Sequence, residues 1–458
     1  MQASLLRELA RIVGKERVQA SPEDLLCYSY DGTFVACRPD VMVKPVSTEQ
    51  VARVLEFAYR EGIPVHPRGA GTGLSGGSVP RGGGIALVMT AMNNIYEINP
   101  EDMLAVADPG VITAQLHRAV EEKGLFYPPD PGSAEVCTLG GNVAECAGGP
   151  RALKYGVTRD YILGLEVVLA GGRVIRPGGR TVKNVTGYDL CRLFTGSEGT
   201  LGVITKITLR LIPKPPAVKT ILAAFKDLVQ TGEAVNAILS AGIIPRTLEI
   251  MDSISIAIVE QFSPCGLPRE AAAVLLIETD GDREQAQRDA EKVVAVLEEI
   301  GATQIRLAAD AREAGELWRA RRAVSPAITR IKPTKISEDA TVPRSQVPAM
   351  IRRLGQIREK YQIDLVIFGH AGDGNLHPNI ACDSRDAGEM LRVEKAIAEI
   401  FQAALELGGT LSGEHGIGLL KAPFLMTELG EAGYQVMRDI KRSLDPKNIL
   451  NPHKIFSG

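Results

Sequence analysis

The sequence predicts an α+β protein built of two main parts, and three observations support this fold class. Residues up to about 211 are rich in glycine and contain strand-like apolar runs, such as GLEVVLAGGRVI at 164–175. The segment Leu211–Pro216 (LIPKPP) interrupts this pattern, because proline continues neither a helix nor an inner strand. After it, apolar strands alternate with amphipathic helices. The second part is therefore expected to contain a mainly antiparallel sheet with helices packed on it.

The expected elements follow in order along the chain. Residues 1–14 (MQASLLRELARIVG) are typical of an amphipathic helix. In the second part a strand–helix–strand pattern occurs twice, which indicates a weak internal repeat and a sheet covered on one side. The segments of this repeat are 219–225, 234–240 and 246–252, followed by 271–279, 284–301 and 303–308. The proline-bounded tail 444–456 (LDPKNILNPHKIF) is expected to pack as an extended end.

Composition excludes several classes of protein. The chain has 458 residues, which is enough for two or three domains, and 45 % of them are hydrophobic. A formal net charge of −3 and the lack of a polybasic arm argue against nucleic acid as a partner. No apolar run is long enough to span a bilayer, and the N-terminus lacks the features of a signal peptide. The seven cysteines form no C-x-x-C pair, so we expect no iron–sulfur cluster and a cytoplasmic location.

Glycine-rich loops in the first part point to an anionic ligand. Gly71, Gly73 and Gly76 formally match G-x-G-x-x-G, but SVPRGGG follows them and cannot form the helix of a dinucleotide fingerprint. Successive unshielded N–H groups can still form an anion-binding nest, while the alternative is a loop of tight turns. Two further stretches favour the ligand: a second small-residue loop at Ser133–Gly149, and KNVTGYDLCRLFTGSEGTLGVIT at 183–205.

These motifs together resemble the FAD-binding domain of the vanillyl-alcohol oxidase and p-cresol methylhydroxylase superfamily. GHAGDGNLH, SGEHGIG and LDPKNILNP in the second half are similar to its FAD-linked 2-hydroxyacid dehydrogenase branch. That branch includes glycolate oxidase and D-lactate dehydrogenase. The resemblance implies an FAD-binding domain of two subdomains at 1–213, a substrate or cap domain with a metal site at 214–425, and a C-terminal segment at 426–458 that packs back on the FAD domain.

The same resemblance implies which residues contact FAD. They lie in the two glycine-containing loops and in the GSEGTLGV segment. They are Arg68, Gly69, Ala70, Gly71, Thr72, Gly73, Leu74, Pro131, Ser133, Thr138, Gly140, Gly141, Asn142, Gly148, Gly156, Glu198, Gly199 and Val203. The loop RGAGTG lacks the histidine that covalent relatives place within it, so FAD is expected to be held without a covalent bond. His66, just upstream, is the one residue that argues otherwise.

A predicted hairpin carries two of the six histidines. Asp364–Gly369 (DLVIFG) is a candidate strand, and Asp373-Gly374 is a strong signal for a two-residue turn. That turn would place His370 directly opposite His377, with the two Cβ atoms about 4.5–5.5 Å apart on one face. Asn379, two residues beyond His377, would point to the same face. Two such imidazoles can converge on one metal ion.

Further site residues come from the resemblance. It implies His370, His377 and Glu414 as metal ligands and His415 as the catalytic base. The metal expected first is Zn²⁺, with Mn²⁺ and Fe²⁺ as alternatives, because nitrogen and oxygen ligands discriminate poorly among these ions. The alternative for the hairpin is a pair of histidines that bond only to their neighbours.

The resemblance also places a carboxylate-binding arginine at Arg321. We expect a helix that begins before Pro326, on which Arg321 and Ser325 share a face while Arg322 points elsewhere. Ser325 and Asn379 complete the expected substrate contacts, and the alternative is a solvated basic helix. In the 2-hydroxyglutarate branch a lysine precedes the D-x-S/T-x-P element, whereas this chain has Ser337 there and Lys335 two residues earlier. This departure favours a small acid such as lactate or glycolate.

The expected function is FAD-dependent oxidation of a small D-2-hydroxyacid to the 2-oxoacid. The alternatives are a D-2-hydroxyglutarate dehydrogenase, a flavoprotein of the alkyl-dihydroxyacetone-phosphate synthase type without net oxidation, and a non-catalytic electron-passing subunit. The chain encodes no onward electron carrier, so we expect an iron–sulfur subunit, an electron-transfer flavoprotein or a quinone to receive the electrons. Such a partner could also bring the cytoplasmic protein to the membrane periphery.

Overall fold

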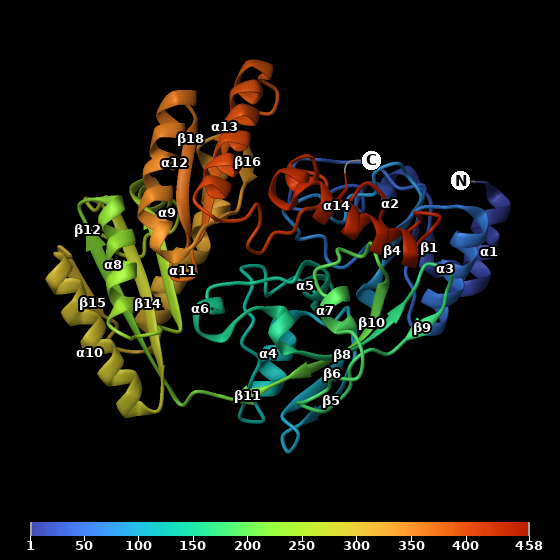
Figure 1. Cartoon of the computed structure of the whole chain (residues 1–458), viewed down its shortest axis with the longest axis horizontal. Coiled ribbons are helices and arrows are strands. Elements are labelled where there is room, and N and C mark those ends of the chain that lie inside the picture. The colour runs from blue at the N-terminus through green and yellow to red at the C-terminus, as the bar shows by residue number, and fades with distance from the viewer. Residues whose placement is uncertain (1, 457–458) are drawn as a thin grey trace. The chain divides into compact units, whose positions relative to one another are not determined.

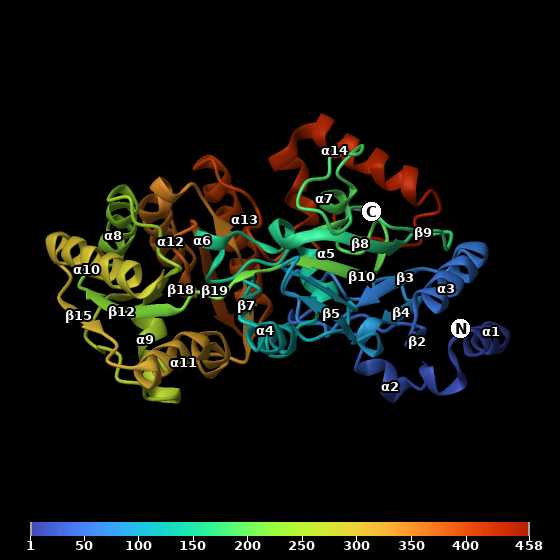
Figure 2. The same ribbon diagram turned by 90° about the horizontal axis from the view of Figure 1, so that it is seen from below.

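The computed structural model describes residues 2–456 and divides into two compact units. Unit 1 contains the chain up to Ala147, Val157–Lys214 and the residues from Glu414 on, while unit 2 contains Gly148–Gly156 and Pro215–Gly413. Unit 1 thus combines the glycine-rich half with the C-terminal segment. Figure 1 and Figure 2 show the ribbon in two orientations.

Unit 1 begins with a small sheet whose strands run in the order β1-β2-β4-β3. The two neighbours of β4 are parallel to it. The strands are β1 (Val18–Gln19), β2 (Val41–Val43), β3 (Val65–Arg68) and β4 (Ile85–Val88). Helices α1 (Ala3–Val13) and α3 (Thr48–Glu61) bury their apolar residues in one cluster with these strands, which confirms the predicted N-terminal helix. A short helix, α2 (Pro22–Leu26), lies between β1 and β2 in the sequence.

The second sheet of unit 1 is antiparallel, in the order β5-β6-β10-β8-β9. Its strands are β5 (Ile95–Asn99), β6 (Leu104–Ala107), β8 (Ile162–Val168), β9 (Val174–Ile175) and β10 (Val203–Arg210). A separate pair joins β7 (Leu125–Phe126) to β11 (Ile212–Pro213). Apolar side chains of four helices share a core with this sheet: α4 (Thr113–Glu121), α5 (Leu139–Glu145), α7 (Leu190–Phe194) and α14 (Leu425–Leu444).

Unit 2 is built on a large antiparallel sheet in the order β15-β12-β14-β13-β18-β19-β16, with β17 paired to β19. The strands are β12 (Ala217–Phe225), β13 (Thr247–Asp252), β14 (Ala273–Gly281), β15 (Gln304–Leu307), β16 (Thr334–Ser337), β17 (Ala340–Thr341), β18 (Asp364–His370) and β19 (Asn375–Cys382). The mainly antiparallel sheet and both strand–helix–strand segments of the predicted repeat are confirmed.

The sheet of unit 2 is covered on both faces, so the predicted one-sided cover is wrong. One face packs against α8 (Leu228–Ser240), α10 (Arg283–Ile300), α12 (Val347–Tyr361) and α13 (Ala387–Glu406). The other face packs against α9 (Ser253–Phe262) and α11 (Ala311–Ala327), as Figure 2 shows. The strands are apolar on both sides: Ile221 and Ala223 face one layer, and Leu222 and Ala224 face the other. A strand that buries both faces reads as a continuous apolar run, which does not reveal a second helical layer.

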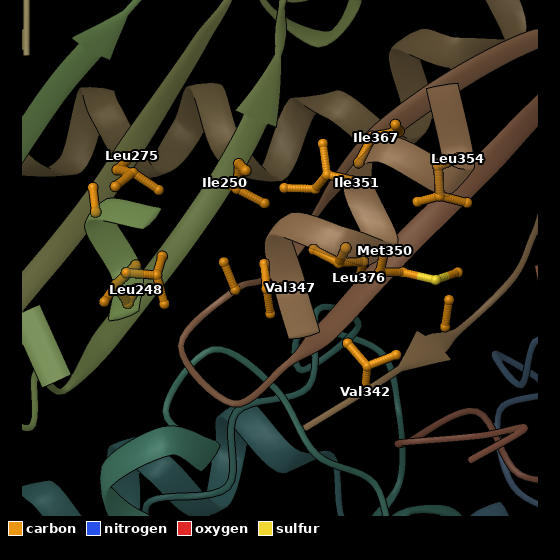
Figure 3. Packing of buried hydrophobic residues seen from close by; sticks show 14 of the residues in the cluster. Leu248, Ile250, Leu275, Val342, Val347, Met350, Ile351, Leu354, Ile367 and Leu376 are labelled. Carbon is orange, nitrogen blue, oxygen red and sulfur yellow. The ribbon is translucent and has the colours of Figure 1, made fainter. Parts of the chain in front are cut away.

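Figure 3 shows how α12 packs on the first of these faces. Its apolar residues recur at helical spacing and point toward the strands, so the helix is fixed by burial of one stripe. The residues that meet in this core include Val347, Met350, Ile351, Leu354, Leu248, Ile250, Ile367 and Leu376.

Two local expectations in unit 1 are wrong. The second small-residue loop contains helix α5, because the Thr138 hydroxyl caps it by accepting a bond from the Gly141 N–H (3.3 Å) and because Leu139 is buried. The tail is a series of turns and not extended, with positive φ angles at Asn448 and Asn451.

Candidate active site

The hairpin β18–β19 carries both predicted histidine ligands, but its register differs from the prediction. His370 opposes Asn375, and His377 opposes Phe368, because the chain turns over four residues, 371–374. The pairing is shifted by two residues from the predicted one. Since side chains alternate with a period of two, this shift leaves both histidines on the same face as diagonal neighbours.

The two imidazoles meet a carboxylate at this end of the hairpin. The candidate ligand atoms of His370, His377 and Glu414 all lie within 4.8 Å of one another. The histidine rings are perpendicular, at an interplanar angle of 89°, and their centroids are 4.9 Å apart. Both histidines are buried and Glu414 is partly buried. The three metal ligands that were expected from the sequence therefore lie close together.

A buried glutamate that the sequence analysis missed holds one of these histidines. Glu249 on β13 accepts a hydrogen bond from His370 Nδ1 at Oε1 (2.7 Å). A carboxylate only accepts, so Nδ1 carries the proton and Nε2 is the nitrogen that would bind an ion. Burial raises the pKa of Glu249, but the neighbouring His370 and Arg321 side chains outweigh burial and hold the pKa below its usual value.

Arg321 lies in the same cluster. It extends from α11, is 8 % exposed, and bonds the second oxygen of Glu249 through Nε (2.8 Å) and a terminal nitrogen (2.7 Å). Its guanidinium also covers the Phe368 ring at 4.7 Å. Glu249 thus joins the predicted carboxylate-binding arginine to the predicted metal ligand His370. The expected contrast with Arg322 is confirmed, since Arg322 is exposed.

The other predicted substrate residues are also in unit 2. Ser325 accepts a bond from Lys335 Nζ (2.7 Å). Asn379 is fully buried, accepts a bond from the Ser337 hydroxyl (2.5 Å), and donates to the His377 carbonyl (3.0 Å). The amide oxygen and the amide nitrogen of Asn379 are thus both hydrogen-bonded, which fixes the strand beside His377.

The peptide that carries Glu414 is held on its N-terminal side by Asp339. One oxygen of this buried carboxylate accepts bonds from the Ser412 hydroxyl (2.9 Å) and the Gly413 N–H (2.9 Å). Asp339 belongs to the DATVP element of the sequence. Its role is to fix the backbone immediately before the metal-ligand candidate.

In unit 1, a second buried carboxylate holds the segment that follows His415. Glu198 accepts bonds from the N–H groups of Ile417 and Gly418, both at 2.7 Å. The resemblance implied a cofactor contact for Glu198, and the structure places its carboxylate on this backbone. Glu145 lies against the same turn, and burial together with the charge of Glu198 raises its pKa well above the usual value.

The donor set suits a divalent transition-metal ion. Two neutral imidazole nitrogens and one carboxylate oxygen are the ligands of many catalytic zinc sites, which keep further positions for water or substrate. The bond from His370 to Glu249 is the usual outer support of such a ligand. Among residues 2–456, this is the one cluster of at least three candidate side chains that meets these distances.

Two of the loops expected to bind FAD lie against each other in unit 1. A methyl group added at Gly69 would overlap the Thr138 hydroxyl, and one at Gly71 would overlap the Arg68 guanidinium. Gly71 also has a φ of +73°, which favours glycine. These close approaches require glycine and leave backbone N–H groups unshielded, which fits a pyrophosphate ligand. Of the remaining predicted contacts, Gly148 and Gly156 fall in unit 2.

Comparison with known proteins identifies the family. Residues 39–178 match the description "FAD binding domain", and residues 214–455 match "FAD linked oxidases, C-terminal domain". The chain belongs to the FAD-linked oxidases. This FAD-linked oxidase is 48 % identical to "Glycolate oxidase subunit GlcD" of Bacillus subtilis, covering 98 % of this chain and 96 % of that protein. It is 38 % identical to "D-lactate dehydrogenase" of Archaeoglobus fulgidus, covering 91 % of each chain.

Solved structures confirm the fold of this FAD-linked oxidase. p-Cresol methylhydroxylase with bound substrate superposes with a TM-score of 0.82 at 21 % identity, covering 99 % of this chain and 96 % of that one. Alkyldihydroxyacetonephosphate synthase superposes with a TM-score of 0.78 at 19 % identity, covering 99 % and 86 %. The predicted p-cresol methylhydroxylase fold and the assignment as an FAD-linked oxidoreductase are confirmed. Within residues 2–456, no helix combines the length and apolarity of a membrane span.

Proposed function

We propose that this oxidase converts a small D-2-hydroxyacid, lactate or glycolate, to the corresponding 2-oxoacid. The observation that carries the proposal is the convergence of His370, His377 and Glu414 within 4.8 Å. Relatives named as a glycolate oxidase subunit and a D-lactate dehydrogenase support this substrate class. Ser337, at the position where a lysine stands in the 2-hydroxyglutarate branch, favours the small acids over that dicarboxylate.

A metal ion bound at this site would assist removal of the hydroxyl proton. His370, His377 and Glu414 would hold the ion, with Zn²⁺ first and Mn²⁺ or Fe²⁺ as alternatives. Such an ion lowers the pKa of an oxygen ligand by several units. His415 follows Glu414 in the chain, and its Nε2 lies 3.9 Å from a Glu414 oxygen, so it is the residue that we assign to accept the proton.

Arg321 and Asn379 position the acid. A guanidinium is suited to a carboxylate because its N–H groups match the two oxygens. Glu249 fixes the direction of Arg321 before substrate arrives, since it holds both the Nε and a terminal nitrogen. Orienting the acid in this way sets which face of its C2–H bond is presented for oxidation.

FAD supplies the redox chemistry by accepting the hydride from C2. We assign FAD binding to residues 1–213, the substrate and metal site to 214–425, and a supporting role to 426–458. His66 is fully buried, and its two ring nitrogens contact Asn451 Oδ1 and the Gly83 carbonyl, each at 3.0 Å. These contacts support non-covalent FAD, because both nitrogens of His66 already have partners within the protein.

The reduced flavin then requires an acceptor. The relatives named as subunits support a place in a larger oxidase complex. We therefore propose an iron–sulfur subunit or an electron-transfer flavoprotein as partner, with quinone as the further alternative. The isolated chain should react slowly with oxygen or NAD, and rapid turnover with NAD as sole acceptor would contradict this.

An anaerobic titration tests the proposed function. The metal-loaded, FAD-containing protein is mixed with D- and L-lactate, glycolate and D-2-hydroxyglutarate while flavin absorbance is followed. Bleaching by D-lactate or glycolate supports the proposal, and preferential bleaching by D-2-hydroxyglutarate supports that alternative. Absence of bleaching with every acid would contradict an oxidase and favour chemistry without net oxidation or a purely electron-passing subunit.

A further inference from the structure

A short segment of the glycine-rich half of the chain belongs to unit 2. Gly148–Gly156 lies in unit 2, although the chain up to Ala147 and the chain from Val157 belong to unit 1. The two ends of this excursion are joined within unit 1, because the N–H and the hydroxyl of Thr158 both donate to the Ala147 carbonyl (3.2 and 2.7 Å). Thr158 is fully buried. Segment 148–156 is therefore a loop with a fixed neck.

Helix α6 (Ala152–Tyr155) forms part of this loop, and a buried carboxylate of unit 2 holds it. Lys154 Nζ pairs with one carboxylate oxygen of Asp280 and donates to the Asp280 carbonyl (3.0 Å). The Tyr155 hydroxyl donates to the other carboxylate oxygen (2.7 Å). Asp280 lies on β14 and is 1 % exposed. A helix of about one turn has little stability of its own, so these bonds decide where α6 lies.

Leu153 of the same helix packs against the turn that joins the two histidine ligands. It is 8 % exposed and belongs to the hydrophobic core of unit 2. A methyl group added at Gly372 would lie 2.5 Å from Leu153 Cδ2. Gly372 belongs to the turn 371–374, which lies between His370 and His377. Leu153 therefore fills the space that this glycine leaves beside the turn.

This packing bears on the geometry of the metal site. An ion is bound well only where the ligand distances are kept to within about 0.2 Å. The turn 371–374 sets the positions of His370 and His377 relative to each other, because it is the chain between them. Removing side-chain volume beside the turn would leave a cavity into which the turn can relax. Leu153 thus acts on the site through the turn and is a positioning residue.

We propose that segment 148–156 couples FAD binding to metal binding, with Leu153 as the residue that positions the hairpin of His370 and His377. The segment lies within residues 39–178, which match the description "FAD binding domain", and its ends are two of the expected FAD contacts, Gly148 and Gly156. This inference rests on the proposed function, since it needs both the flavin and the metal site. Coupling is reciprocal, so each ligand raises the affinity for the other by the same factor.

The test uses the full FAD-containing chain with Leu153→Ala, which removes the packing, and Leu153→Met, which keeps the volume. Lys154→Met releases the other anchor of α6 and provides a second variant. The control is Leu297→Ala, which truncates a buried leucine of the same core on α10. Competition with a chelating dye gives the Zn²⁺ affinity. Flavin fluorescence on dilution gives the FAD dissociation constant of Zn²⁺-loaded and of chelator-treated protein.

We expect Zn²⁺ to lower the FAD dissociation constant of the wild type by about 5- to 150-fold, the usual range of coupling between two sites. Leu153→Ala and Lys154→Met should bring this factor close to one. They should also weaken Zn²⁺ binding about 10- to 100-fold, as for a lost outer support of a metal ligand. Leu153→Met should restore both quantities. Leu297→Ala should lose stability and keep the coupling of the wild type.

Three results would overturn the inference. The first is a wild type whose FAD dissociation constant is the same with and without Zn²⁺. The second is unchanged coupling in both Leu153→Ala and Lys154→Met. The third is an equal loss of coupling in Leu153→Ala and Leu297→Ala, which would make Leu153 an ordinary core residue.

These binding measurements need no turnover, so they keep the inference distinct from the proposed function. If no acid bleaches the flavin while the coupling depends on Leu153, the proposed oxidation fails and the coupling stands. If lactate or glycolate bleaches the flavin while Zn²⁺ and FAD bind independently, the proposed function stands and the coupling is overturned.

Discussion

Replacing Glu249 with Gln should weaken metal binding although Glu249 is not itself a ligand. The carboxylate is fully buried and receives His370 Nδ1 on one oxygen and Arg321 on the other. Gln keeps the shape, but its NH₂ group must face either the imidazole N–H or the guanidinium, and both are donors. One of the two contacts is therefore replaced by a repulsive donor pair.

The size of the effect follows from these contacts. Loss of the outer hydrogen bond to a metal-ligating histidine typically reduces metal affinity by about 10- to 100-fold. Arg321 is 8 % exposed, and removing the acidic partner of a buried ion pair lowers the free energy of unfolding by about 3–5 kcal/mol. Glu249→Gln should show both effects.

Competition with a chelating dye gives the metal affinity, and urea denaturation gives the free energy of unfolding. Glu278→Gln is the matched control: Glu278 is a buried carboxylate of the same sheet that accepts from Trp318 Nε1 and pairs with Arg246. The control should lose stability and keep its metal affinity. If Glu249→Gln loses stability but binds metal as tightly as wild type, Glu249 is only a structural partner of Arg321.

Two further predictions concern unit 1. Burial and the charge of Lys454 lower the pKa of His66 to about 4. Below pH 6.5 the unfolded chain therefore binds a proton at this histidine that the folded chain does not bind. The free energy of unfolding consequently decreases as the pH is lowered from 6.5 to about 4. When the pH is lowered from 7 to 5, the free energy of unfolding from urea denaturation should decrease by about 2 kcal/mol more for wild type than for His66→Gln. Equal decreases would contradict the assigned pKa. FAD should separate from the polypeptide on acid precipitation, and flavin that remains with the pellet would refute non-covalent binding.

The sequence predicted that His370 and His377 share a face because side chains alternate along a strand, and the family resemblance added Glu414. His370 and His377 were assigned to one face from a turn that the structure does not contain. The conclusion held because the true register differs by two residues, and any even shift preserves the face. A shift of one residue would have separated the two histidines.

Glu249 could not be found in the same way. It lies 121 residues before His370 in the sequence, and the two meet only because β13 pairs with β18 in the middle of the sheet. The one available signal was Glu249 in the middle of the apolar strand TLEIMD, which also ends in the acidic Asp252, since a buried charge needs a partner. The order of strands in a sheet depends on non-local contacts, which this pattern does not encode.

His370, His377 and Glu414 are proposed to hold a metal ion that is needed for flavin reduction. The most direct test is elemental analysis of the purified protein beside anaerobic stopped-flow flavin reduction, for wild type and for Ala variants at these positions and at His415. The control is His117→Ala, which should behave as wild type. His117 lies in unit 1 and contacts the Pro129 carbonyl.

We expect one metal ion per wild-type chain, its loss in the three ligand variants, and FAD retained in all of them. His415→Ala should keep the metal and reduce the flavin roughly 10²–10⁴-fold more slowly, as expected for loss of a general base. A wild-type protein that holds no stoichiometric metal, and whose flavin is reduced at the same rate after chelation, would contradict a catalytic metal at these three residues.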